Sequence, residues 1–170
     1  MLLNIKPTGI YDLTKAISKL SDLLSEKVKA TNQVIEKNLI SKEASIIGDI
    51  ASHLINSGGK RIRPLLTLAA SKLFGYQGDK DTFLAAAIEY IHSATLLHDD
   101  VIDRSPKRRG LQTANIIWTN KYSVLVGDFL FSRAFQLMVR TQSLKVMKTL
   151  SDASAIISEG EILQVGIEKK

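Results

Sequence analysis

Residues 81–103 read DTFLAAAIEYIHSATLLHDDVID, a stretch that joins a helical apolar pattern to an acidic end. Apolar side chains recur at spacings of three and four and cover most of the circumference of the predicted helix. A helix at the surface keeps a broad polar face, so this pattern predicts a central helix that its neighbours bury. Ser105 and Pro106 end the helix, and a polar loop is expected over 107–113.

The sequence on both sides of this stretch shows the same helical period. Strict alternation of apolar and polar residues, which is typical of half-buried strands, does not occur. The other helices that we predict are a long one with an apolar stripe from Leu13 to Ile35, one over about 46–55 stopped by Asn56, one from Pro64 to Gly75, one over about 121–141 and one over about 144–165. The predicted fold class is all-α, and residues 1–170 form part of one domain.

The composition excludes several classes of protein. Hydrophobic residues make up 45% of the 170 residues and charged residues 24%, which is enough for a packed core. Cysteine is absent, which excludes a disulfide scaffold, a thiolate zinc site and a cysteine nucleophile. A net charge of +6 favours anionic partners such as phosphorylated metabolites, nucleic acid or a membrane surface. The longest apolar runs have about six residues and a membrane span needs roughly 20, so we expect a cytoplasmic protein with no transmembrane segment.

Three aspartates stand close together at the end of the central helix. Asp99 and Asp103 are four residues apart, so they share a helix face at a separation of ~6 Å. Asp100 lies ~100° further round the helix. Carboxylates at this distance repel unless a cation lies between them, and oxygen ligands that share a cation with phosphate favour Mg²⁺. The alternative is a solvated acidic helix end, which the helix dipole disfavours.

Two basic segments and one histidine flank these aspartates. Residues 58–64, GGKRIRP, combine glycines with Lys60 and Arg63 just before a helix, which is a plausible cradle for an anion. Arg108 and Arg109 follow the aspartates by a short loop, and arginine forks bind phosphate oxygens in pairs. His92 lies two turns before Asp99 on nearly the same face. Taken singly, each feature is also explained by solvated charges or by a histidine that packs in the core.

In this order, the motifs resemble those of the trans-isoprenyl diphosphate synthases, which elongate prenyl chains head to tail. The resemblance covers about residues 10–166. The aspartate motif alone is weak, because terpene cyclases share it, whereas the ordered set is specific. The matching segments are GGKRIRP at 58–64, His92, LLHDDVID at 96–103, RRG at 108–110, VGD at 126–128 and EGEILQ at 159–164. The resemblance implies an isoprenoid synthase-type helical bundle around an apolar tunnel.

The resemblance also implies roles for individual residues. The isopentenyl diphosphate site would consist of Lys60, Arg63, His92 and Arg109. Asp99 and Asp103 would be Mg²⁺ ligands under the allylic diphosphate, with Asp100 in support, and Arg108 would clamp that diphosphate. The catalytic set is then Asp99, Asp103 and Arg108. The implied reaction ionises the allylic diphosphate, and the double bond of isopentenyl diphosphate attacks the resulting cation.

Product length is expected to depend on the helix face below the aspartates. Thr95 and Ala94 precede Asp99 by four and five residues, and Ile91 lies a further turn down. Family members with short products place bulky residues near this level. The small pair here therefore favours a long product, of the octaprenyl type used for quinone side chains.

One feature departs from the family pattern. The family carries a second aspartate-rich motif on a later helix, and this sequence does not contain one. We therefore expect residues 1–170 to be the N-terminal half of a polyprenyl synthetase domain. The C-terminal half could be supplied by a separate chain. The expected assembly is a homodimer. The alternative is a non-catalytic fragment or helper subunit. A basic nucleic-acid binder is disfavoured, because the arginines cluster in two loops beside acidic residues.

Overall fold

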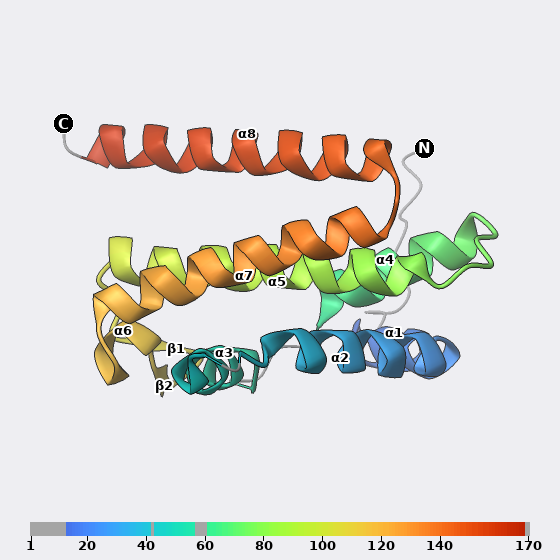
Figure 1. Cartoon of the computed structure of the whole chain (residues 1–170), viewed down its shortest axis with the longest axis horizontal. Helices are drawn as coiled ribbons and strands as arrows, with labels where there is room; N and C mark the ends of the chain where they lie inside the picture. Colours follow the sequence, from blue (N-terminus) through green and yellow to red (C-terminus); the bar gives the residue numbers. More distant parts are fainter. Residues whose placement is uncertain (1–12, 42, 57–60, 169–170) are drawn as a thin grey trace, which may run out of the picture.

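The computed structural model describes residues 13–41, 43–56 and 61–168 (Figure 1). The predicted all-α class is confirmed, since the regular elements of the described residues are helices apart from one short antiparallel hairpin. In chain order the elements are α1 (Leu13–Leu23), α2 (Ser25–Leu39), α3 (Ser45–Asn56), α4 (Ile62–Leu73), α5 (Lys80–Ile102), β1 (Lys107–Arg108), β2 (Leu111–Gln112), α6 (Ala114–Ile117), α7 (Asn120–Arg140) and α8 (Leu144–Glu168).

The helices lie in three layers. In Figure 1, α8 forms one outer layer, α5 and α7 lie in the middle, and α1, α2 and α3 form the opposite outer layer. The central position predicted for residues 81–103 is confirmed, because α5 packs along α7 and also contacts α2 and α4. Tyr90 is fully buried in this core, where its hydroxyl donates to the Ile35 carbonyl at 2.5 Å. Burial raises the pKa of the Tyr90 hydroxyl.

The long first helix that we predict is divided at Leu24. The backbone of Leu24 has φ −110° and ψ 15°, which is outside the helical region, so α1 and α2 are separate helices. The Leu24 side chain is buried with Leu65, Leu68 and Ala85. The apolar stripe passes through Leu24 without interruption, so the periodicity could not show this break. The hairpin of β1 and β2 and the short α6 were also not predicted, because elements this short have no periodicity of their own.

A Schellman motif ends α5. The Ser105 amide donates to the Asp100 carbonyl at 3.0 Å, and the Arg104 amide donates to the Val101 carbonyl at 3.3 Å. Arg104 has φ 51°, the left-handed conformation that usually belongs to glycine at this position. The motif turns the chain sharply after the aspartates and leads it directly into β1.

Gly127 on α7 faces the His98 side chain of α5. A Cβ added to Gly127 would lie 2.3 Å from His98 Nε2, so only glycine leaves room for the imidazole as it stands. Nearby, the Ser123 hydroxyl donates to the Leu97 carbonyl at 2.8 Å. These contacts fix the position of α7 beside the acidic end of α5.

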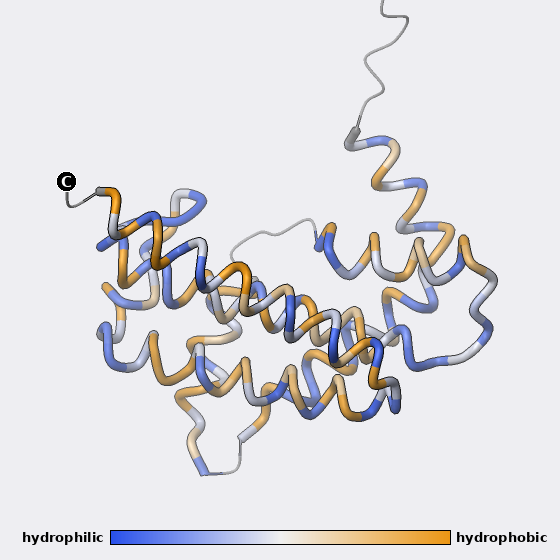
Figure 2. Tube along the Cα trace, turned by 90° about the horizontal axis from the view of Figure 1, so that it is seen from above, coloured by the Kyte–Doolittle hydropathy of each residue, from blue (hydrophilic) through white to orange (hydrophobic). Residues whose placement is uncertain are grey.

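Much of the apolar surface of α8 is uncovered by the rest of the chain. Ile156, Ile162 and Leu163 are 68%, 72% and 68% exposed, and Figure 2 shows hydrophobic residues along the length of this helix. Its contact with α7 is sparse. Within the three described ranges, however, no helix combines the length and the apolar character that a membrane span requires.

Candidate functional site

The end of α5 separates its three aspartates by exposure. Asp103 is exposed at the last turn, Asp99 is half-buried, and Asp100 is 1% exposed. Burial raises the pKa of Asp99, and the nearby carboxylates of Glu161 and Asp103 raise it further. Mutual repulsion of this kind is relieved by a cation, so Asp99 and Asp103 suit a hard divalent ion.

These carboxylates do not by themselves enclose a metal ion. Across the described ranges, no three acidic or histidine side chains come together as a metal-holding group. Mg²⁺ is usually bound through one or two carboxylates, with waters and substrate phosphates as its other ligands. A pair of aspartates at the mouth of a diphosphate site therefore fits the ion that the sequence predicts.

Asp100 does not lie with the other two aspartates. Its Oδ1 atom accepts bonds from Arg108 Nε at 3.0 Å and from Arg108 Nη2 at 2.9 Å. The carboxylate is 2% exposed and the Arg108 side chain 29%. We expected Asp100 to support the metal ligands. In the structure its carboxylate bonds to Arg108 instead and so joins α5 to β1. The ~100° offset of Asp100 from Asp99 predicted a different helix face. It could not predict that Arg108 would be the partner.

A tight turn places Arg109 at the tip of the hairpin. Arg108 pairs with Leu111, and the two residues between them, Arg109 and Gly110, have φ values of 52° and 84°. Two left-handed residues in a two-residue loop are typical of a type I′ turn. His53 on α3 anchors the hairpin, because its Nε2 lies 2.8 Å from the Gln112 carbonyl oxygen.

A basic cavity of about 100 Å³ lies between the start of α4, the middle of α5 and this hairpin. The structure brings together Arg63, His92 and Arg109, three of the four residues predicted for isopentenyl diphosphate. Lys60, the fourth, lies outside the described residues. Arg61 also lines the cavity, and its guanidinium is hydrogen-bonded to Asn32 Oδ1.

Among the residues that sequence reasoning missed in this cavity is the acidic residue Glu89. Burial raises the pKa of Glu89, and the charges of Arg61, Arg63 and Arg109 oppose that shift. The signal was present, because Glu89 precedes His92 by three residues and so shares its helix face. Burial and the arginines Arg63, Arg109 and Arg108 lower the pKa of His92 to about 4, so at neutral pH this imidazole is an uncharged hydrogen-bonding group.

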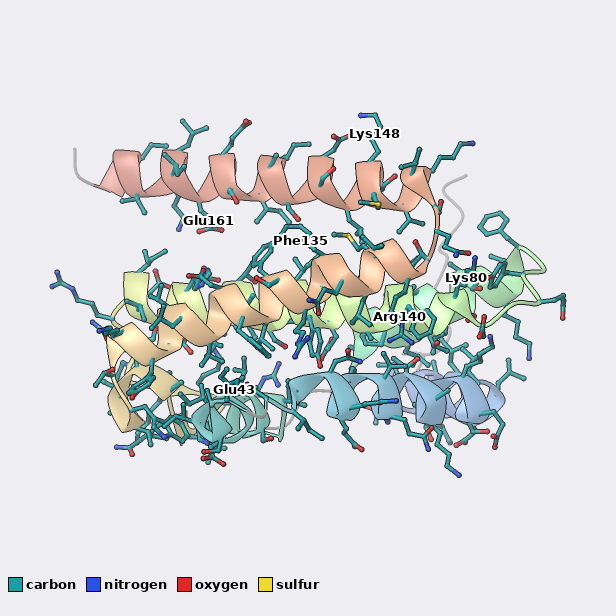
Figure 3. All side chains as sticks on the ribbon, viewed as in Figure 1. Glu43, Lys80, Phe135, Arg140, Lys148 and Glu161 are labelled. Atoms are coloured by element: carbon teal, nitrogen blue, oxygen red, sulfur yellow. The ribbon has the colours of Figure 1, made fainter. Side chains whose placement is uncertain are left out.

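Glu161 brings α8 to the acidic end of the site. In Figure 3, Glu161 points from α8 toward the middle layer, whereas Lys148 points away from it. The influence of Glu161 on Asp99 places the two carboxylates within electrostatic range of each other. The sequence singled out this residue only as part of a motif, with no role attached.

An apolar cavity of about 320 Å³ runs between α5 and α8 below Asp99. Ile91 and Thr95, two of the residues expected to influence product length, line it, and so do Leu150 and Ile157 of α8. Ala94 is placed differently. It is 0% exposed and packs in the hydrophobic core, because the turn of the helix directs it away from the groove that Thr95 lines.

Comparisons with known proteins agree on one family. A family model described as polyprenyl synthetase matches residues 44–170. The chain is 44% identical over 149 residues to octaprenyl diphosphate synthase of Escherichia coli, covering 88% of this chain and 46% of that protein. It is 33% identical to heptaprenyl diphosphate synthase component 2 of Geobacillus stearothermophilus, again covering 88% and 46%.

Solved structures give the same result. The fold matches a decaprenyl diphosphate synthase from Rhodobacter capsulatus with a TM-score of 0.86 at 52% identity, covering 88% of this chain and 46% of the other. It also matches a polyprenyl synthase from Caulobacter crescentus, crystallised with calcium and isoprenyl diphosphate, with a TM-score of 0.85 at 50% identity, covering 88% and 45%. The chain therefore spans about half the length of the relatives it matches.

Proposed function

The chain belongs to the polyprenyl synthetase family, and on this basis we propose that it carries the first half of the active site of a trans-polyprenyl diphosphate synthase. The observation that carries the proposal is the position of Arg108 between the basic cavity, which its neighbour Arg109 lines, and the acidic end of α5, where it binds Asp100. Arg108 acts electrostatically on His92 in the basic cavity and on Asp99 at the acidic end of α5. An apolar cavity opens directly below. Such a site offers cationic groups for two diphosphates and apolar surface for one hydrocarbon chain.

The two diphosphates are assigned to different parts of the site. Arg63, His92 and Arg109 hold isopentenyl diphosphate. Lys60, which belongs to the same sequence motif as Arg63, completes this set. Arg108 holds the allylic diphosphate. Asp99 and Asp103 are the ligands for Mg²⁺, on which this family generally depends. When bound, the ion would neutralise charge that develops on the departing diphosphate.

In the proposed reaction the allylic carbon–oxygen bond breaks and its electron pair leaves with the diphosphate. The double bond of isopentenyl diphosphate then attacks the allylic cation, and a proton is lost to restore a double bond. His92 is a weak base, because its pKa is about 4. We therefore assign the proton to the departing diphosphate, which Arg108 holds close to the new bond.

We propose a long product that serves as a quinone side chain and is made in the cytoplasm. Relatives named as octaprenyl and decaprenyl synthases support this length. An apolar cavity of about 320 Å³ below Asp99 offers the start of a path for the growing chain. Ile91 and Thr95 line this path, and Ala94 supports it from the core side.

Completion of the active site requires the other half of the family fold, either in a longer chain or on a separate one. The chain spans about half of its relatives, and the exposed apolar side chains of α8 provide a surface for further helices. The family's homodimeric assembly is proposed for the complete protein. A helper subunit is the second candidate, because one relative is named as a component of a synthase.

An elongation assay tests the proposal. Labelled isopentenyl diphosphate and farnesyl diphosphate are supplied with and without Mg²⁺, to this chain and to this chain completed by the remaining half. Asp99→Ala should lower the activity of the complete enzyme by orders of magnitude, because several kcal/mol of charge stabilisation is lost. Asp152→Ala, which removes a carboxylate paired with Lys148 on the surface, is the control. Turnover of Asp99→Ala at the wild-type rate would exclude this role.

A further inference from the structure

We propose that Asp100 binds no cation and instead positions the Arg108 guanidinium for the allylic diphosphate, an inference that rests on the function proposed above. The three neighbouring aspartates would then divide into two ligands and one positioning residue. Their exposure already separates them, since Asp103 is exposed and Asp99 half-buried, whereas Asp100 is 1% exposed.

The Asp100 carboxylate is occupied by the protein itself. Two N–H groups of Arg108 converge on Oδ1 at 3.0 and 2.9 Å. The backbone carbonyl of Asp100 is also engaged, because it accepts from Asn115 Nδ2 at 3.2 Å and from the Ser105 amide at 3.0 Å. A buried carboxylate loses its hydration, and the Arg108 charge compensates for that loss. To reach a cation beside Asp99, Asp100 would have to abandon this charge.

The geometry leaves the other edge of Arg108 for a ligand. Nε and Nη2 form one edge of the planar guanidinium, and these atoms bind Asp100. A guanidinium has five N–H groups, so the two bonds leave Nη1 and one hydrogen of Nη2 for phosphate oxygens. Asp100 thus fixes the plane of the fork, which is the property that paired recognition of phosphate needs.

The backbone on which Arg108 stands is fixed separately. The Thr113 hydroxyl donates to the Ser105 carbonyl at 2.6 Å, and the Thr113 amide donates to the Pro106 carbonyl at 3.2 Å. His53 anchors the far strand at Gln112. These bonds hold the base of the hairpin, so the loss of Asp100 should release the Arg108 side chain while the hairpin keeps its place.

The experiment measures binding of inorganic pyrophosphate to the whole chain by calorimetry over a range of Mg²⁺ concentrations. Asp100→Asn keeps the shape of the side chain but removes its charge. It should weaken pyrophosphate binding about tenfold, ~1.4 kcal/mol, and leave the Mg²⁺ midpoint unchanged. Asp99→Asn should shift that midpoint. Asp152→Asn breaks an ion pair on the surface of α8 and should change neither quantity.

A double-mutant cycle and a spectroscopic signal show whether Asp100 acts through Arg108. In the Arg108→Ala background, Asp100→Ala should weaken pyrophosphate binding no further. The Arg108 Nε–H resonance should exchange slowly with solvent in the wild-type chain and rapidly in Asp100→Asn. The wild-type measurement needs no substitution, so it tests the anchoring even if a variant fails to fold.

The outcomes distinguish a failure of the inference about Asp100 from a failure of the proposed function. If the wild-type chain binds no pyrophosphate, the proposed function fails. If the wild type binds and Asp100→Asn binds equally well, the positioning role is refuted. If Asp100→Ala shifts the Mg²⁺ midpoint in the Arg108→Ala background, Asp100 is a cation ligand and the inference is wrong. Rapid exchange of the Arg108 Nε–H in the wild type would likewise overturn it.

Discussion

His92 links the site to pH at the scale of a single residue. Its pKa falls from 6.5 to about 4 because of burial and three arginines. The unfolded chain takes up a proton near pH 6.5, whereas the folded chain does so only near pH 4. This group therefore lowers the stability of the fold progressively as the pH falls from 6.5 to 4, and has little effect above 6.5.

We expect His92→Gln to remove part of that pH dependence. The fall in melting temperature between pH 6.5 and 4 should be smaller in His92→Gln than in the wild type, and the two should converge above pH 7. Parallel profiles for His92→Gln and the wild type would contradict the buried, neutral histidine.

Arg109 combines a backbone cost with a proposed binding role. Its φ of 52° is unfavourable for most residues by roughly 1–2 kcal/mol, and asparagine tolerates it better. Arg109→Asn relieves this backbone cost but removes the guanidinium, so it should weaken isopentenyl diphosphate binding. Arg109→Lys keeps the charge but loses the fork, and should mainly raise the KM for isopentenyl diphosphate in the complete enzyme. If Arg109→Lys changed only the KM of the allylic substrate, the assignment of the two arginines would be wrong.

Thr95 and Ala94 are adjacent but face different surroundings. Thr95 lines the cavity below Asp99, whereas Ala94 is fully buried in the core. Thr95→Phe should therefore shorten the products of the complete enzyme by filling the cavity. Ala94→Phe should instead destabilise the fold by about 1–3 kcal/mol, because it overpacks the core. Chromatography of the products and thermal melts distinguish the two effects. An unchanged product ladder in an active Thr95→Phe enzyme would show that the growing prenyl chain does not pass through this cavity.

At the scale of elements, the α5–α7 contact depends on Gly127. Its substitution by alanine would place Cβ 2.3 Å from His98 Nε2, which lies 3.2 Å from the Val124 carbonyl oxygen. Gly127→Ala should destabilise the fold by about 1–2 kcal/mol, since the displaced imidazole outweighs the gain in helix propensity.

Gly160 on α8 is the matched control for Gly127. A Cβ at Gly160 meets nothing within 4 Å, so Gly160→Ala should stabilise the chain by up to ~1 kcal/mol. The double variant His98→Ala with Gly127→Ala should recover part of the lost stability. Equal melting temperatures for Gly127→Ala and Gly160→Ala would show that the close approach is unimportant.

The sequence predicts elements that carry a long periodic signal and misses those that do not. The bounds of α5, α7 and α8 agree with the prediction within a few residues, since each repeats its pattern over several turns. The β1–β2 hairpin has two residues per strand, so no period could appear. In the candidate site, the residue types and their order were readable from the motifs. The burial of Asp100 and the core position of Ala94 were not, because they depend on which neighbour packs on each helix face.

For the whole molecule, the main surface feature is the uncovered apolar face of α8. Large apolar side chains at Leu144, Ile156, Ile162, Leu163 and Ile167 are each at least 68% exposed. Burial of one such side chain contributes about 1.5–3 kcal/mol, so a surface of this kind favours association with further apolar helices. Glu161 points from the same helix toward the middle layer (Figure 3), and its charge raises the pKa of Asp99. Movement of α8 would therefore also disturb the acidic end of the site.

We expect this chain alone to elongate prenyl diphosphates slowly or not at all. Its two exposed or half-buried aspartates offer one bank of metal ligands, and the chain spans about half the length of its relatives. Addition of a chain that supplies the remaining half should restore elongation and slow hydrogen exchange in α8, since the same contact completes the site and covers the helix. Charged substitutions at Ile156 and Ile162 should weaken both effects together, whereas Lys37→Ala on α2, in the opposite outer layer, should weaken neither. Rapid elongation by the purified chain alone would show that the residues on this half suffice for the chemistry.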